Sequence, residues 1–305
     1  MLIKWKKCPN CQGYHDPTLE KCPRCHKHNE LYLDRKISNN IAFMHPAAQI
    51  GLFLAGFSFG GMFIAELIVA LFLQGIADEL LYKTMVISIT YLLMFLGLSL
   101  IIIFTRRDYF FKKYKRAIDY IYGLGYAITI VLVSMIVASI INLFQPVTEN
   151  ANQEAAVAVT QNYPILAFFV LGIIGPICEE LTYRVGLYSF LRRFNKYFAI
   201  AFSSIVFALI HFDLTVSIPL TIILLAFLFL DLPKSAIVTV IVLAIVGFNI
   251  HAVFNEASIT ELIAFPSYLV SGVILTLAYE HRGPACSMTA HIAYNIFALV
   301  LMLAS

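Results

Sequence analysis

Apolar segments of bilayer-spanning length recur along almost the whole of this 305-residue chain. A helix needs about 20 mainly apolar residues to cross the hydrocarbon core of a bilayer. Such segments fold as helices because lipid offers no hydrogen-bond partner to the backbone. Only 13% of the residues are charged, and the mean hydropathy of +0.83 is too high for a soluble domain. The sequence therefore predicts an all-α, polytopic membrane helix bundle with about eight to nine transmembrane helices.

The predicted spans cover most of the chain after residue 45. They lie at 46–74, 84–104, 120–144, about 163–190, 198–212, 215–230, 236–254, 265–279 and 285–304. The number of spans between residues 213 and 256 is left open. We divide the chain into a small module at 1–36, N-terminal transmembrane helices at 37–162 and a membrane core at 163–305.

Basic residues gather on one side of this layout. Eight of the 21 lysines and arginines precede the first predicted span, and eleven more lie in loops that face the same side as the N-terminus. The loops at 145–161 and 255–262, predicted to face the other side, contain neither lysine nor arginine. Because loops rich in Lys and Arg stay in the cytoplasm, we expect a multi-pass protein of the cell membrane with a cytoplasmic N-terminus.

Two CxxC pairs, separated by ten residues, lie near the start of the chain. The four cysteines are Cys8, Cys11, Cys22 and Cys25. This spacing matches a tetrahedral structural zinc site, and so short a segment could hardly fold without metal. Disulfides would need an oxidising compartment, which the surrounding positive charge argues against. We predict a cytoplasmic zinc ribbon that either binds a protein partner or only caps the N-terminus.

The fourth predicted span carries two carboxylates and an arginine at Glu179, Glu180 and Arg184. A charge at bilayer depth costs several kcal/mol and usually marks a functional site. Glu180 and Arg184 stand at i and i+4, which suits an ion pair along one helix face. Successive helix residues point about 100° apart, so Glu179 faces elsewhere. We predict that Glu179 is the reactive carboxylate and that the ion pair supports it; a purely structural polar cluster is the alternative.

Two further spans carry polar side chains at a similar depth. His211 lies in the fifth span, and His291 and Asn295 stand at i and i+4 in the last. Counting 1.5 Å per residue places Glu179, His211 and Asn295 each about 20 Å from the basic end of its helix, and His291 about 14 Å from it. We therefore expect the four side chains to line one cavity, which opens toward the cytoplasmic half.

A carboxylate, two imidazoles and an amide can activate water and stabilise an oxyanion. Two histidines and a glutamate could also hold a catalytic zinc ion, so a catalytic metal stays open. A proton or ion pathway would bury similar residues, but it would be favoured by repeats that we do not find. A rival pair with the same spacing, His251 and Asn255, lies near the outer boundary of its span.

Three motifs in this order resemble those of the CPBP family, the CAAX-protease and bacteriocin-processing membrane proteins, which include type II CAAX prenyl endopeptidases and Abi proteins. The motifs are Glu179-Glu180-x-x-x-Arg184, Phe207-x-x-x-His211 and His291-x-x-x-Asn295. The resemblance covers about residues 163–304. It implies an intramembrane endopeptidase in which Glu179 and His211 activate water while His291 and Asn295 stabilise the oxyanion.

The resemblance also sets the expected partners. We expect contact with the lipid bilayer, a membrane-associated or lipidated peptide or protein as substrate, and no nucleic acid. The alternative function is a non-catalytic membrane scaffold, or an immunity or regulatory protein, that uses the zinc ribbon to bind a partner. Both mechanisms attached to the family, with and without a metal, remain open.

Overall fold

The computed structural model describes the transmembrane bundle and parts of the N-terminal module. The described residues are 6–8, 11, 14–15, 21–22, 25–26, 46–60, 63–72, 76, 78–112, 116–144, 151–193, 195–211 and 259–304. The spans predicted at 215–230 and 236–254 lie outside them, and so does the rival pair His251 and Asn255. Within the described residues, four helices are long and apolar enough to cross a membrane.

The N-terminal half of the bundle contains four helices. They are α1 (Pro46–Gly60), α2 (Phe63–Phe72), α3 (Glu79–Lys112) and α4 (Ala117–Phe144). Within the span predicted at 46–74, the structure describes two helices, α1 up to Gly60 and α2 from Phe63. Large apolar side chains are exposed along α3 and α4, as expected of helices in contact with lipid.

A short helix, α5 (Ala151–Asn162), precedes the segment that carries the glutamates. That segment is continuous from residue 164 to 191 but changes register along its length. It consists of α6 (Pro164–Phe169), the π-helical turn η2 (Val170–Ile174), α7 (Gly175–Glu179), the π-helical segment η3 (Glu180–Tyr188) and α8 (Ser189–Leu191). The first π-helical turn ends at Ile174, two residues before Pro176, a residue that has no N–H and that crowds a regular turn.

The remaining described helices are α9 (Lys196–Leu209), α12 (Ile259–Arg282) and α13 (Pro284–Ala304). Asn195 caps the start of α9, where its side chain accepts a hydrogen bond from the N–H of Phe198 at 3.0 Å. A single residue, Gly283, joins α12 to α13 with φ at 86°, a conformation that glycine adopts without strain. Pro284 then begins α13, so the two helices run antiparallel.

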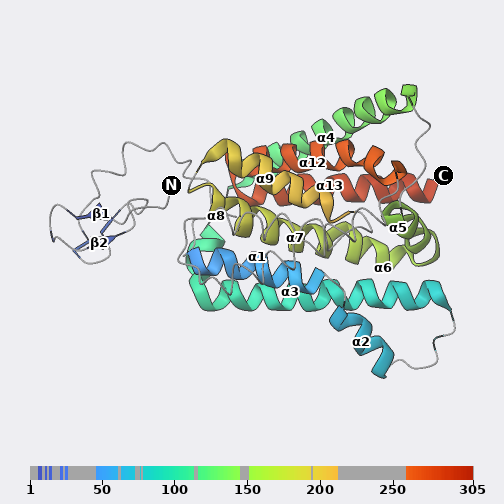
Figure 1. The fold of residues 1–305 in the computed structure, drawn as a ribbon, viewed down its shortest axis with the longest axis horizontal. Coiled ribbons are helices and arrows are strands. Elements are labelled where there is room, and N and C mark those ends of the chain that lie inside the picture. The colour runs from blue at the N-terminus through green and yellow to red at the C-terminus, as the bar shows by residue number, and fades with distance from the viewer. Residues whose placement is uncertain are drawn as a thin grey trace, which may run out of the picture.

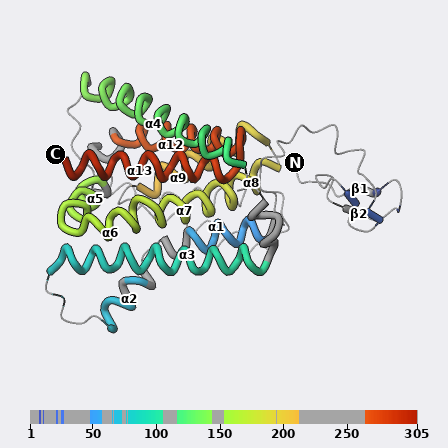
Figure 2. The backbone as a smooth tube through the Cα atoms, turned by 180° about the vertical axis from the view of Figure 1, so that it is seen from behind, coloured from blue at the N-terminus to red at the C-terminus, as the bar shows by residue number. Residues whose placement is uncertain are grey.

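The helices pack into one bundle (Figures 1 and 2). α13 contacts α4 and α12, α9 contacts α12, and α1 packs between α3 and η3. In both views α8 lies at one end of the bundle, while α5 and the C-terminus lie at the other. We call the first the basic end, because ion pairs there bring together basic side chains of three loops. These are Arg116, Arg192, Lys196 and Arg282.

Gly186 permits the close approach of α1 to η3. A Cβ atom at this position would lie 2.9 Å from the backbone nitrogen of Phe53 and 3.1 Å from the carbonyl oxygen of Gln49. Membrane helices commonly approach through small residues in this way, since van der Waals packing drives their association. The helix that carries the glutamates is thereby held against the N-terminal part of the chain.

Candidate active site

Four residues predicted from the sequence line one cavity of about 520 Å³. Glu179 comes from α7, His211 from the turn after α9, and His291 and Asn295 from α13. The volume lies within the range of about 300–1,000 Å³ that is typical of ligand pockets. The bundle thus brings together side chains from three separate motifs.

Each oxygen of the Glu179 carboxylate faces a different side chain. Oε1 accepts a hydrogen bond from the hydroxyl of Tyr91 at 2.8 Å. Oε2 lies 3.7 Å from Nε2 of His291. The side chain keeps 11% of its surface accessible, so a small molecule in the cavity can reach the carboxylate.

Tyr91 was not predicted from the sequence. It lies on α3, outside all three motifs, and its ring packs against Gly175 just before the glutamates. Along the sequence, Tyr91 is marked only by its hydroxyl group within an apolar span. Tyrosines occur commonly in such spans, so this feature does not single it out. The contact with Glu179 joins residues 88 positions apart, and only the packing of α3 against α7 creates it.

Glu180 and Arg184 form the predicted ion pair, with 3.4 Å between Oε1 and Nη1. Both side chains are almost completely inaccessible, at 0% and 1%. The guanidinium of Arg184 also lies 4.2 Å from the centre of the Phe207 ring and donates a hydrogen bond to the carbonyl of Gly272 at 3.2 Å. The arginine therefore connects η3 with both α9 and α12.

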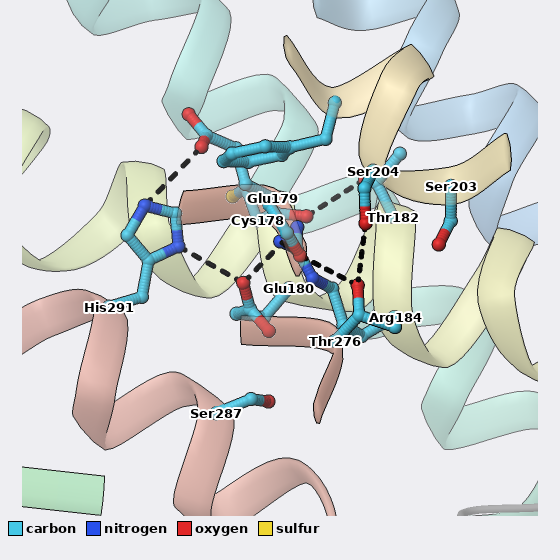
Figure 3. A network of polar contacts seen from close by, with 12 residues as sticks. Cys178, Glu179, Glu180, Thr182, Arg184, Ser203, Ser204, Thr276, Ser287 and His291 are labelled. Carbon is cyan, nitrogen blue, oxygen red and sulfur yellow. Dashed lines mark hydrogen bonds and ion pairs between the residues drawn. The ribbon is translucent and has the colours of Figure 1, made fainter. Parts of the chain in front are cut away.

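His291 lies between the two carboxylates (Figure 3). Its Nδ1 is 3.1 Å from Oε1 of Glu180, and its Nε2 faces Glu179. Two nitrogens that both face carboxylates suit an imidazole that donates hydrogen bonds. The change from α-helix to π-helix falls between Glu179 and Glu180, and such register changes occur frequently at functional sites.

His211 has a defined tautomer when it is neutral. Its Nδ1 lies 2.8 Å from the carbonyl oxygen of Phe207. Because a carbonyl only accepts, Nδ1 must carry the proton, which leaves a lone pair on Nε2. The ring stacks on Tyr268 with 4.5 Å between centroids, so the imidazole is held in one orientation beside the cavity.

Asn295 holds α13 against the first π-helical turn. Its side-chain nitrogen donates a hydrogen bond to the carbonyl of Leu171 at 2.9 Å. An amide nitrogen carries two hydrogens, so a second donor remains on the side chain that lines the cavity. The rival pair His251 and Asn255 lies outside the described residues and cannot be compared with it.

The cavity extends toward the end of the bundle where α5 and the C-terminus lie. Its walls include Gln153 and Ala156 from α5 and Met302 near the end of α13. We expected an opening toward the cytoplasmic half, whereas the described lining leads away from the basic end. The space on that side is filled by Tyr188 and Tyr279, whose side chains pack edge to face and are 0% exposed.

The basic end is closed by an ion-pair cluster that was also not predicted. Glu280, one residue beyond the predicted span at 265–279, accepts hydrogen bonds from Arg192 at 2.9–3.2 Å and from the hydroxyl of Tyr188. Lys196 lies 3.4 Å from the same carboxylate. Burial disfavours the charged carboxylate, but the hydrogen bonds from Arg192 and Tyr188 outweigh burial and hold the pKa of Glu280 below its ordinary value.

The four N-terminal cysteines lie together beside a two-stranded antiparallel sheet of β1 (Lys6–Lys7) and β2 (Tyr14–His15). Their sulfur atoms all lie within 4.8 Å of one another. The Cys8–Cys25 and Cys11–Cys22 sulfur separations are 3.7 and 3.6 Å. A tetrahedral zinc ion with bonds of about 2.3 Å requires sulfur separations of about 3.8 Å, so this donor set fits zinc.

Comparison with known proteins identifies one family. A family model described as type II CAAX prenyl endopeptidase Rce1-like matches residues 161–297. The matched segment contains all the motif residues from Glu179 to Asn295, while Tyr91 and the four N-terminal cysteines lie outside it. No curated protein and no solved structure matches the chain.

Proposed function

We propose that this chain hydrolyses a peptide bond with water that Glu179 and His211 activate. Its residues 161–297 match the family model described as type II CAAX prenyl endopeptidase Rce1-like. The substrate is a membrane-associated or lipidated peptide or protein. The observation that carries the proposal is the convergence of Glu179, His211, His291 and Asn295 on one cavity. A buried, partly accessible carboxylate beside two imidazoles is suited to general base catalysis.

In the proposed reaction, Glu179 takes a proton from water through Oε2, since Oε1 already accepts from Tyr91. The lone pair on Nε2 of His211 accepts the second hydrogen of that water and orients it. The water oxygen attacks the carbon of the peptide carbonyl, and the carbonyl oxygen becomes an oxyanion. The free N–H of Asn295 donates to it, and so does Nε2–H of His291, whose ring is an imidazolium in this step because its Nδ1 donates to Glu180. Such stabilisation contributes about 3–4 kcal/mol in a dry site. The proton on Glu179 passes to the leaving nitrogen as the C–N bond breaks, which regenerates the carboxylate.

Glu180 and Arg184 support this chemistry without contacting the substrate. Glu180 accepts from Nδ1 of His291 and thereby fixes the orientation of the ring. Arg184 balances the charge of Glu180 and holds Phe207 beneath its guanidinium. The second imidazole, His211, follows Phe207 by one turn, so the same arginine helps to position both histidines.

We place the N-terminus and the basic end of this multi-pass membrane protein in the cytoplasm. Support comes from the distribution of lysine and arginine along the chain. The zinc ribbon then lies in the cytoplasm, where four cysteines remain reduced and available as ligands. We assign it structural zinc and, as its partner, a protein.

The test compares two adjacent carboxylates and one distant one. Glu179→Gln is nearly isosteric but cannot act as a base, so we expect cleavage to be lost while the protein stays inserted and folded. Glu180→Gln should lower both activity and stability, because Arg184 stays buried without its partner. Glu154→Gln on α5, where the side chain is exposed, is the matched control and should retain activity.

The measurement is the appearance of new N-termini in membranes of cells that express each variant, detected by mass spectrometry, with the protein level measured in parallel. New termini that persist in Glu179→Gln and in His211→Ala would contradict the catalytic assignment. If both variants also keep the cellular phenotype of the unchanged chain, the protein acts as a membrane scaffold.

A further inference from the structure

The cavity follows one face of each of two antiparallel helices away from the glutamates. On α13 the lining residues recur with helical spacing from His291 to Met302, a distance of about 16 Å along the axis. On α12 they run from Leu275 back to Ala264, which leads toward the same end because the two helices are antiparallel. The site therefore forms the deep end of a space that reaches toward α5 and the C-terminus.

The opposite side of the site is closed in the described part of the bundle. Tyr188 and Tyr279 fill the space between η3 and α12, and the hydroxyl of Tyr279 lies 2.8 Å from that of Ser189. Beyond them, Arg192, which follows α8, forms an ion pair with Glu280 of α12 at the basic end. A polypeptide could pass there only if these contacts were broken.

We infer that the substrate reaches Glu179 from the non-cytoplasmic end of the bundle, so that the bond cleaved lies in a non-cytoplasmic segment of a membrane-anchored polypeptide. The basic end, closed at the site, faces the cytoplasm by the distribution of lysine and arginine. Among the described residues, the path that remains leads to the other face of the membrane. This inference rests on the proposed function and specifies the side from which the substrate enters.

The walls of the cavity indicate the kind of segment that enters. Its described lining contains no lysine or arginine, and small side chains such as Ala264, Ser267 and Ser271 recur along α12. A free C-terminal carboxylate would therefore find no cationic partner among these residues. The lining suits an internal, uncharged and mainly apolar segment, held in an extended conformation beside Glu179.

The first experiment measures access directly with a membrane-impermeant maleimide applied to intact cells. Ala298→Cys places a thiol in the cavity wall, and Lys196→Cys places one at the basic end, where the lysine side chain is 42% exposed. We expect the first to be labelled on intact cells and the second only after permeabilisation. The unchanged chain provides the background: Cys178 and Cys286 are fully buried, and any labelling of the four N-terminal cysteines after permeabilisation is measured in it and subtracted. Labelling in the reverse order overturns the inference.

The second experiment separates this inference from the proposed function. Two single-span reporter proteins carry the same apolar segment on the cytoplasmic or on the non-cytoplasmic side of an identical span. We expect cleavage of the non-cytoplasmic reporter only, and its loss in Glu179→Gln. Cleavage of the cytoplasmic reporter alone would overturn the direction of entry and leave the protease assignment intact. Cleavage of neither reporter would count against the proteolytic function, while the labelling result still decides the side of access.

Discussion

Tyr91→Phe removes the hydrogen bond that the Tyr91 hydroxyl donates to the carboxylate of Glu179. Tyr91 lies outside the segment that matches the family model. The ring, which packs against Gly175, is retained, so the helix contact between α3 and α7 should survive. A hydrogen bond to a charged group contributes about 1.5–3 kcal/mol. If the whole of this hydrogen-bond energy is lost from the transition state, the activation barrier rises by the same amount. At about 1.36 kcal/mol per factor of ten in rate, kcat then falls about ten- to 150-fold. We expect a fall in kcat with little change in KM, because the hydroxyl holds the base rather than the substrate.

The assay is the rate of cleavage of a membrane-bound reporter by purified, reconstituted protein over a range of reporter concentrations. Thermal unfolding of each variant is measured alongside. The matched control is Tyr126→Phe, which removes a hydroxyl that contacts His281 at the basic end and should leave kcat unchanged. A Tyr91→Phe protein with an unchanged kcat would refute the reasoning. A loss of activity that is fully explained by a smaller fraction of folded protein would refute it as well.

Three further changes test other parts of the structure. Gly186→Ala should lower the unfolding temperature, since the added Cβ would lie 2.9 Å from the backbone of α1; an unchanged temperature would contradict this close approach. Cys8→Ser with Cys22→Ser should remove one bound zinc per chain, measured by elemental analysis, and leave the bundle folded; unchanged metal content would contradict the zinc assignment. The pKa of Glu280 in the folded protein is lowered from its ordinary value of 4.5. The carboxylate therefore contributes to stability above pH 4.5, and this contribution is lost as the pH falls through the pKa of the folded state. Glu280→Gln should therefore weaken the acid dependence of unfolding, and an identical pH profile would count against the cluster.

Local patterns along the sequence determined the fold class and the motif residues. Hydropathy predicted a helical membrane bundle, and helices confirm it. The three motifs predicted the family, and the match over residues 161–297 confirms it. The i and i+4 spacing of Glu180 and Arg184 predicted their ion pair, which is present. The boundaries of the predicted modules and the catalytic roles stay predictions.

Tertiary structure decided which side chains from distant helices meet. Tyr91 with Glu179 and Arg192 with Glu280 are pairs 88 positions apart, and no spacing rule relates residues so far apart. The direction of the cavity likewise depends on where bulky side chains such as Tyr188 fill the bundle. Sequence periodicity gives the depth of a residue along its helix and the face on which it lies. The rotation of each helix about its axis, and the neighbour that this face meets, follow only from packing the whole bundle, because each helix is positioned by contacts with several others.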